Sequence, residues 1–422
     1  MCSRSDRALR GFIGLIAFAV AVPFFGAPPA QAWPVGASSD VAIENFTVKS
    51  KDGDTFLIPH ADFANTNLSK DEIAALLNPD TPEADKRALV TKLKADKIAA
   101  PSIEIDAKDG AKIKVHDFLA SDIDGGRVGK FGFSSIESSA ASASSPVSFK
   151  SGSLQVEGLD VADVLKAVEG SDGGGKGGRL EHLTWNAIDI VAPDSQNAEG
   201  KPVHIALGAL EVRGGYSGDV LREGSTKLTG VVIEPAADSD EGKNLADLGY
   251  SKVELAVNVS ANYRADAKTF TLDNFTVDGV QMGSVALKAD FSDVPAELLT
   301  GDKEARLQAL LECGVASLEL RLVNAGLFEK ALALAAKQQG STPDALKQQW
   351  SAVIGQMAPL FLGGSPSALQ AAAETQKFIA SPHNLAISLK AKQGPLKAND
   401  FMAMSDPAAF LGKLDISAVA NQ

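Results

Sequence analysis

Two histidines occupy similar places in two hairpin-like stretches and come nearest to a chemical motif in this sequence. His60 is followed by Asp62, and His116 is followed directly by Asp117. Two imidazoles and a carboxylate are sufficient ligands for Zn²⁺. If the two hairpins stack, both histidines would face one side, with Asp62 or Asp117 completing a metal site. The competing interpretation is two ordinary histidines on a polar face, because the spacing matches no specific metal signature.

Other catalytic signatures are missing from the sequence. It contains no GxSxG nucleophile elbow, no HExxH pair and no CxxC. Its many acidic residues include no pair whose spacing indicates acid–base chemistry. We therefore predict no catalytic residue, no bound metal and no cofactor, and the four residues His60, His116, Asp62 and Asp117 are the only candidates for a site.

The elements that would position these residues are hairpins with Asp-Gly turns. AIENFTVKS and TFLIPHADF alternate in polarity around Asp52 and Gly53, and the stretch 102–118 does the same around Asp109 and Gly110. Alternation with a period of two predicts strands, and Asp-Gly is a strong two-residue hairpin signal. After the first hairpin, Ser69 with Glu72 three residues later predicts a capping box at the start of a helix.

A third stretch, Val253–Phe291, is the clearest β-pattern in the chain. It predicts a three-stranded antiparallel meander with one apolar face. Its NFTV segment also occurs at 45–48, which indicates a recurring strand unit. The apolar positions change phase across Asp273 and Asn274, where we expect a β-bulge that curves the sheet.

The composition changes after Pro295, where Ala-rich helical patterns begin. We therefore predict an α+β fold: an extended, curved antiparallel sheet of repeated hairpin units covered by short helices, with a mainly helical C-terminal part. The predicted parts are a cleaved signal peptide at 1–32, a repeated hairpin region at 33–292 and a helix-rich region at 293–422, ending in a strand and a short helix.

The first 32 residues have the pattern of an export signal. Three arginines precede an apolar run that is short for a membrane-spanning helix, and an A-x-A site ends at Ala32. We expect cleavage before Trp33, a periplasmic or secreted bacterial protein and no transmembrane helix afterwards; a retained N-terminal anchor is the alternative. The formal net charge of −13 disfavours nucleic acid and anionic membrane surfaces as partners.

Two longer segments carry a resemblance to known proteins. The unit LDNFTVDGVQMGSVALKADF and the tail LVNAGLFEKALALAAKQQGSTPDALKQQW, followed by SPHNLAISLKAKQGPL, resemble uncharacterised exported proteins of alpha- and other proteobacteria. These are distantly similar to the AsmA-like envelope proteins. The more specific part of the resemblance covers roughly Leu318–Leu396. The resemblance implies a long sheet that cradles lipid. It carries over no functional residue.

Two functions from different classes remain open at this point. The first is a non-enzymatic envelope protein that binds lipid, another apolar ligand or a protein partner along a curved sheet. The second is an exported hydrolase, in its metal-dependent form using His60 and His116. The residues that line the exposed sheet face distinguish them: an aliphatic face favours an apolar ligand, and a cluster of ionisable side chains favours an enzyme.

Overall fold

The structure is a computed structural model. It describes residues 38–51, 53–108, 110–140, 147–160, 179–193, 201–218, 220–300, 303–361, 365–402 and 407–422. The predicted export signal at 1–32 lies outside these residues. The chain divides into two compact units, the first mainly Met1–Ala192 and the second mainly Pro193–Gln422.

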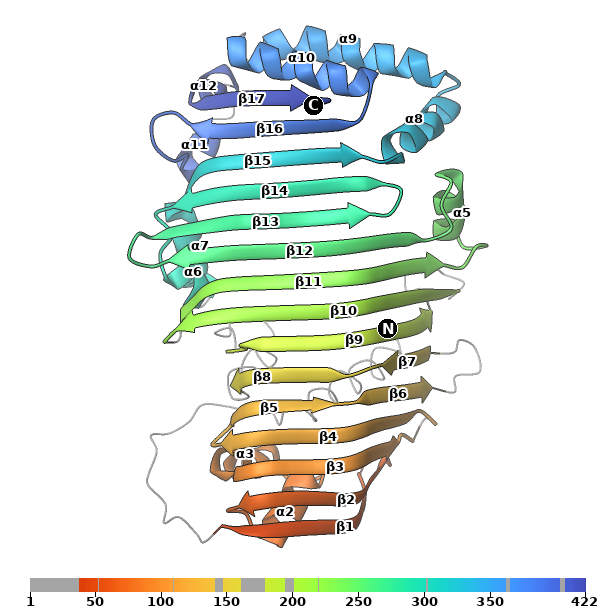
Figure 1. Cartoon of the computed structure of the whole chain (residues 1–422), viewed down its shortest axis with the longest axis vertical. Helices are drawn as coiled ribbons and strands as arrows, with labels where there is room; N and C mark the ends of the chain where they lie inside the picture. The colour runs from red at the N-terminus through yellow and green to blue at the C-terminus, as the bar shows by residue number, and fades with distance from the viewer. Residues whose placement is uncertain are drawn as a thin grey trace. The chain divides into compact units, whose positions relative to one another are not determined.

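The first unit is an antiparallel sheet with two short helices (Figure 1). Its elements are β1 Ser39–Lys49, β2 Thr55–Thr66, α2 Lys70–Leu77, α3 Glu83–Lys92, β3 Lys94–Asp106, β4 Lys112–Asp124, β5 Arg127–Phe133, β6 Ser135–Ala140, β7 Val147–Ser151, β8 Leu154–Asp160 and β9 His182–Pro193. Strands β1 to β4 pair in order. Strand β4 pairs with both β5 and β6, which continue through β8 and β7 to β9.

The two predicted Asp-Gly hairpins are present in this unit. Lys49 pairs with Thr55 at the end of the β1–β2 hairpin, and Asp106 pairs with Lys112 at the end of the β3–β4 hairpin. Gly53 has φ +99° in the first turn, a conformation that L side chains rarely adopt. Local turn chemistry therefore sets the register of both hairpins.

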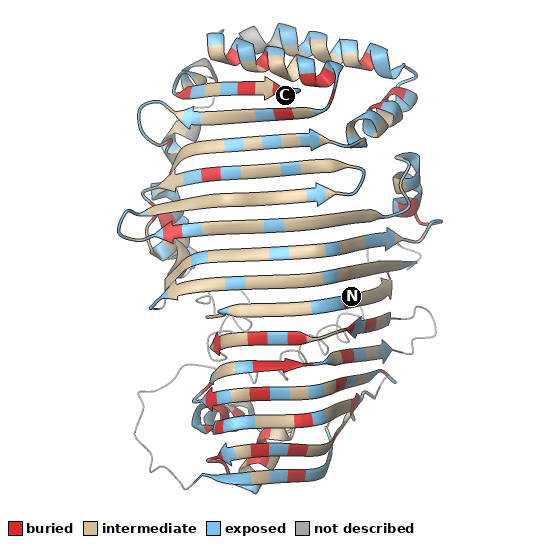
Figure 2. Ribbon diagram, viewed as in Figure 1, coloured by how far each residue is buried: buried red, intermediate tan, exposed pale blue. Residues whose placement is uncertain are grey.

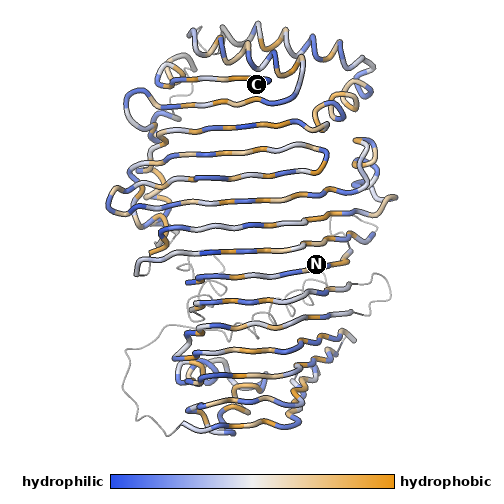
Figure 3. Tube along the Cα trace, viewed as in Figure 1, coloured by the Kyte–Doolittle hydropathy of each residue, from blue (hydrophilic) through white to orange (hydrophobic). Residues whose placement is uncertain are grey.

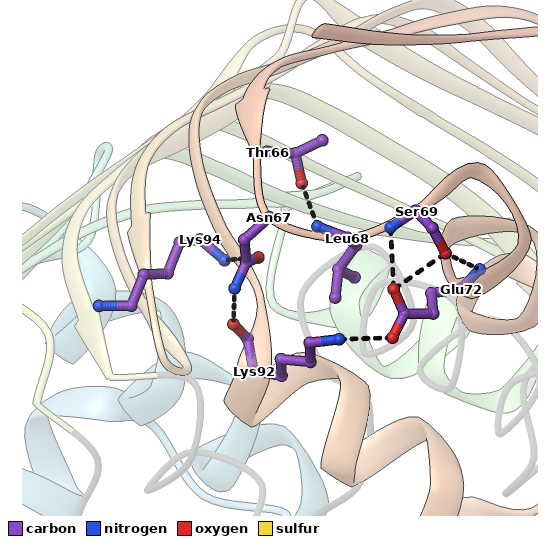
Figure 4. Close-up of polar contacts among 7 residues, drawn as sticks. All are labelled: Thr66, Asn67, Leu68, Ser69, Glu72, Lys92 and Lys94. Carbon is purple, nitrogen blue, oxygen red and sulfur yellow. Dashed lines mark hydrogen bonds and ion pairs between the residues drawn. The ribbon is translucent and has the colours of Figure 1, made fainter. Parts of the chain in front are cut away.

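A network of polar contacts fixes the chain where it leaves β2 (Figure 4). The predicted capping box is confirmed: Ser69 Oγ accepts from the backbone N–H of Glu72, and the Glu72 carboxylate accepts from the N–H of Ser69. Lys92, at the end of α3, forms an ion pair with Glu72. The Asn67 side chain donates to the carbonyl of Lys92 and accepts from the N–H of Lys94. These contacts join the ends of β2 and α3 to the starts of α2 and β3.

Several strands of the first unit contain a residue at positive φ within the strand. These are Asn45 in β1 (φ 49°), Asp117 in β4 (φ 52°) and Ala187 in β9 (φ 51°). Alternation changes phase at each one, so Ile43 and Phe46 both point to the apolar side of the sheet although three positions separate them. This explains why the period-two pattern breaks in the middle of these strands.

The second unit is an antiparallel sheet in which each strand from β10 to β17 pairs with the next. Its elements are β10 Pro202–Ser217, β11 Val220–Pro235, α5 Asp240–Asp247, β12 Val253–Arg264, β13 Thr269–Gly279, β14 Gly283–Ser292, α6 Glu297–Thr300, α7 Lys303–Glu312, β15 Gly314–Asn324, α8 Leu327–Gln338, α9 Pro343–Phe361, α10 Pro366–Ala380, β16 Asn384–Ala391, α11 Ala398–Met402, α12 Pro407–Gly412 and β17 Leu414–Ala420.

The predicted meander and its bulge are confirmed. Strands β12, β13 and β14 pair in antiparallel order, and the register shifts between Leu272 and Phe275 on both sides of β13. The shift places the extra residue at Asp273 and Asn274. It keeps Leu272 and Phe275 on the same face of the sheet, so the apolar surface continues across the irregularity.

The predicted fold class is wrong in its C-terminal part. The chain is mostly antiparallel sheet, and the region 293–422 is not a mainly helical part. Strands β15, β16 and β17 run through it and extend the sheet begun by β10 to β14. The helices there are connections between strands. Strand β17 is specified by its pairing with β16, which lies elsewhere in the chain, whereas the Ala-rich helices have strong local patterns. The local patterns therefore dominated the prediction.

Candidate functional site

The strands of the second unit carry apolar residues aligned in rows across one side of the sheet. One row joins Leu228, Val257, Val277, Val285, Leu322 and Leu385. The next row joins Thr226, Val259, Phe275, Leu287, Leu320 and Ile387. A third contains Ala261, Leu272, Ala289 and Leu318. We call these three rows the apolar face.

The other side of the same strands is polar. Its central row joins Lys227, Asn258, Thr276, Ala286, Arg321 and Ala386. We call this side the polar face. Figure 3 shows the resulting alternation of hydrophobic and hydrophilic residues along β12 to β16. A half-buried antiparallel strand produces this pattern when one face packs against a core and the other meets water.

Exposure in β13 does not follow this polarity, whereas in β15 the polar-face residues Glu319 and Arg321 are exposed and Leu320 on the apolar face is half-buried. Nine consecutive residues of β13, from Thr269 to Val277, are all half-buried, whether they belong to the apolar or the polar face. Val285 on the apolar face is 41% exposed. Most apolar-face side chains in this sheet are therefore partly accessible, although Ala289 is only 4% exposed.

The first unit behaves in the opposite way. In β4, Val115 is 1% exposed, while the adjacent Lys114 is exposed. Figure 2 shows this contrast as buried bands along β1 to β5 and β8, against largely intermediate colouring along β10 to β14. Apolar residues of α2 and α3, including Ile73 at 0% and Val90 at 9%, are also buried. The first unit thus has a closed core, and the second unit has an accessible apolar surface.

Helices cover only the margins of the apolar face among the described residues. Phe378 of α10 is buried against Leu385 and Ala420, with Phe328 of α8 packed beside them. The Phe328 and Phe378 rings meet edge to face with centroids 5.6 Å apart. This cluster covers the β16–β17 side of the face and reaches Leu322 of β15, while the apolar-face residues Val257, Phe275 and Leu287 of β12 to β14 stay half-buried.

The segment that follows β14 covers one end of the strands. Tyr263, at the end of β12, is 4% exposed, and its hydroxyl donates to the carbonyl of Val294 over 3.1 Å. Val294 is itself 1% exposed. Burial raises the pKa of the Tyr263 phenol. Tyr263 therefore marks the covered end of the apolar face on β12.

The histidines singled out by the sequence lie in different surroundings in the first unit. His60 in β2 contacts Glu44 Oε1 through Nδ1 and Asp62 Oδ2 through Nε2, both at 2.9 Å. His116 in β4 pairs with Ser102 of β3. Strand β3 lies between β2 and β4, so the two backbones are about 9.6 Å apart at ~4.8 Å per strand.

The two candidate carboxylates are likewise placed apart. Asp62 Oδ2 contacts the His60 ring, whereas Asp117 accepts a hydrogen bond from Ser134 Oγ over 2.7 Å. Within the described ranges, no three His, Cys, Asp or Glu side chains are grouped so that they could hold a metal ion.

The surroundings of His60 shift its titration. Hydrogen bonds to Asp62 and then to Glu44 raise its pKa above 6.5. A raised pKa means that the stabilisation from these contacts is present below pH 6.5 and is lost as the pH rises through the folded-state pKa. We expect NMR titration of His60 to give a pKa above 6.5, lowered by Asp62→Asn and by Glu44→Gln.

A matched control for this titration is Asp266→Asn, which removes an exposed carboxylate from a turn of the second unit. It should leave the His60 titration unchanged. A His60 pKa at or below 6.5 in the unmodified protein would show that the two carboxylates do not hold the ring in solution.

Comparison with known proteins adds a coarse relationship. Residues 276–421 match a family model whose description is "Uncharacterized protein". The matched region begins in β13 and runs through β17, so it includes much of the apolar face. No curated protein matches the chain. Within the described residues, no helix is long and apolar enough to span a bilayer.

Proposed function

We propose that this chain is a non-enzymatic exported envelope protein that binds lipid, or another long apolar molecule, on the apolar face of its second unit. The observation that supports the proposal most directly is the accessibility of this face. Its residues alternate as a core-facing sheet surface should, yet Val285 remains 41% exposed and Thr269–Val277 of β13 are only half-buried. Large accessible apolar surfaces in soluble domains are typical of binding sites.

The composition of the face favours a hydrocarbon chain over a protein partner. Its rows consist mainly of Val, Leu and Ala, with Phe275 as the aromatic residue in the middle rows. Protein interfaces are typically enriched in Tyr, Trp and Arg at their centres. An aliphatic surface instead offers non-directional burial worth roughly 25 cal/mol per Å² of apolar area.

The dimensions of the face also suit an extended chain. Five strands, β11 to β15, span about 19 Å at ~4.8 Å per strand, and the eight residue steps from Val253 to Ala261 span about 26 Å at ~3.3 Å per residue. A hydrocarbon chain of lipid length could lie within this area without leaving the sheet.

Sequence features support the proposed location and the lipid class of ligand. The arginine-rich, apolar leader that ends at Ala32 is typical of export. The unit at 272–291 resembles strands of AsmA-like envelope proteins, which implies a lipid-cradling sheet. The described first unit places His60 and His116 on separate strands, and no feature of the site geometry favours the hydrolase interpretation.

The test is a direct search for bound lipid. The mature protein should be purified from a bacterial periplasm without detergent and its organic extract analysed by mass spectrometry, with binding of palmitate to the delipidated protein measured by calorimetry. We expect co-purified acyl lipid and saturable binding. An extract free of lipid, together with no heat of binding for palmitate or for monopalmitoylglycerol, would refute the proposed function.

A further inference from the structure

One charged side chain shares the side of the sheet occupied by the apolar face. Arg222 in β11 has the same alternation phase as Gly224, Thr226 and Leu228. Glu223 pairs with Asn262, which places Arg222 across from Tyr263. The residues of this side in the three rows given above, on β11 to β16, are all uncharged. Arg222 is therefore a lone cation at one end of an apolar surface.

The described chain provides no anion for this arginine. Its Nε atom is buried and has no hydrogen-bond partner. The nearby phenol of Tyr263 is already engaged, because it donates to the carbonyl of Val294. The charge of Glu297 raises the pKa of the Tyr263 phenol and the charge of Arg222 lowers it. Among the described residues, however, Glu297 and Arg222 form no ion pair with each other.

Charged residues elsewhere on the second unit are commonly paired. Lys252 pairs with Glu254, and Lys397 with Asp293. A buried polar atom without a partner is costly, because it loses its hydrogen bonds to water and gains none in exchange. Because Arg222 has no ion pair among the described residues, an external anion that reaches its guanidinium group would be stabilised.

We propose that Arg222 binds the anionic head group of an amphiphile whose hydrocarbon chain lies on the apolar face. This inference rests on the proposed function and specifies the class of ligand: a single phosphate or carboxylate attached to a long chain. The guanidinium group donates several N–H bonds in a planar fork that matches the oxygens of both groups. The rest of the chain is strongly acidic, so one arginine provides local attraction without creating a general anion-binding surface.

The geometry sets a direction for the ligand. From Arg222 to Leu228, β11 advances six residues, or about 20 Å at ~3.3 Å per residue. A head group held at Arg222 would direct the chain along Gly224 and Thr226 towards the row that contains Leu228 and Val257.

The test compares ligands that differ in the head group alone. Binding of hexadecyl phosphate, palmitate, monopalmitoylglycerol and inorganic phosphate to the mature, delipidated protein is measured by calorimetry below the micelle concentrations. Variants are Arg222→Gln, Arg222→Lys and the control Lys227→Gln, which removes a cation from the polar face of the same strand. We expect the anionic amphiphiles to bind about 10-fold more tightly than the neutral one, in line with a charged hydrogen bond.

The variants identify the source of that preference. Arg222→Gln should reduce the affinity for both anionic amphiphiles to that of monopalmitoylglycerol, Arg222→Lys should retain part of the preference, and Lys227→Gln should retain all of it. Inorganic phosphate should not bind measurably. Equal binding of charged and neutral amphiphiles, or a preference that survives Arg222→Gln, would overturn the role of Arg222 but leave the proposed function intact.

Two other results would be decisive in different ways. If inorganic phosphate bound as tightly as hexadecyl phosphate, Arg222 would be part of a simple anion site, and the proposal that the ligand is an amphiphile would be overturned. Absence of binding for all chain-bearing ligands would refute both the inference and the proposed function. The circular dichroism spectrum of Arg222→Gln should match that of the unmodified protein, so that a loss of binding reports on the head group and not on folding.

Discussion

Val285→Asp should weaken the binding of long-chain ligands by at least about 10-fold while the protein remains folded. Val285 is 41% exposed on the apolar face. A new carboxylate there stays hydrated in the free protein, but a bound hydrocarbon chain would strip away its water. Desolvating an unpaired charge costs well over the ~1.4 kcal/mol that corresponds to a tenfold change. Calorimetric titration with monopalmitoylglycerol measures the effect without a contribution from the ligand's head group.

The matched control for this substitution is Ala286→Asp, one residue further along β14. Ala286 is half-buried and lies on the polar face, in a row with Thr276 and Arg321. Ala286→Asp adds the same charge to the same strand. Its effect on strand propensity is smaller than that of Val285→Asp, because Ala is already a weak strand former, and both effects are about 1 kcal/mol or less. Ala286→Asp should leave ligand binding unchanged. If both substitutions weakened binding equally, the ligand would not lie on the apolar face.

Val115→Asp should unfold or severely destabilise the first unit. Val115 is 1% exposed in β4 and has no cation on its side of the strand among its paired neighbours Ile103 and Ile136. Burying an unpaired carboxylate there should cost several kcal/mol of unfolding free energy, a large part of the 5–15 kcal/mol typical of a domain. The milder Val115→Ala removes two methyl groups and leaves a cavity, which should cost about 2 kcal/mol.

Urea unfolding followed by tryptophan fluorescence can measure both changes. Trp185 lies in the first unit and Trp350 in the second. A variant in which Trp33 and Trp350 are replaced by Phe reports on the first unit, and one in which Trp33 and Trp185 are replaced by Phe reports on the second. Val115→Ala should lower the urea midpoint seen by Trp185 clearly more than Val285→Ala lowers the midpoint seen by Trp350. Equal losses at the two positions would mean that the apolar face is covered in solution.

Much of the local architecture followed from residue patterns. The Asp-Gly turns at Gly53 and Gly110, the capping box of Ser69 and Glu72, and the bulge at Asp273 are all present. Each depends on residues close together in the chain. Turn geometry, helix capping and side-chain alternation are set by local backbone preferences and nearby hydrogen bonds, so the sequence contains them directly.

The features that sequence patterns missed are long-range. The C-terminal region was expected to be mainly helical because α8, α9 and α10 have strong periodic patterns, but it is organised by strands whose partners are distant in the chain. Leu322 pairs with Leu385 across three intervening helices. The role proposed for Arg222 was also not visible, since the pattern LREGSTKL shows which side of β11 Arg222 occupies but not what lies next to it.

The sequence alone determined that one side of each strand is apolar, because a period of two places alternate residues on opposite faces. It could not determine whether anything covers that side. Val115 and Val285 are both valines in alternating strands, yet one is 1% and the other 41% exposed. Only tertiary packing separates them, because burial depends on which distant helix or loop lies against a sheet. That difference gives the first unit a closed core and the second unit a surface on which a ligand can bind.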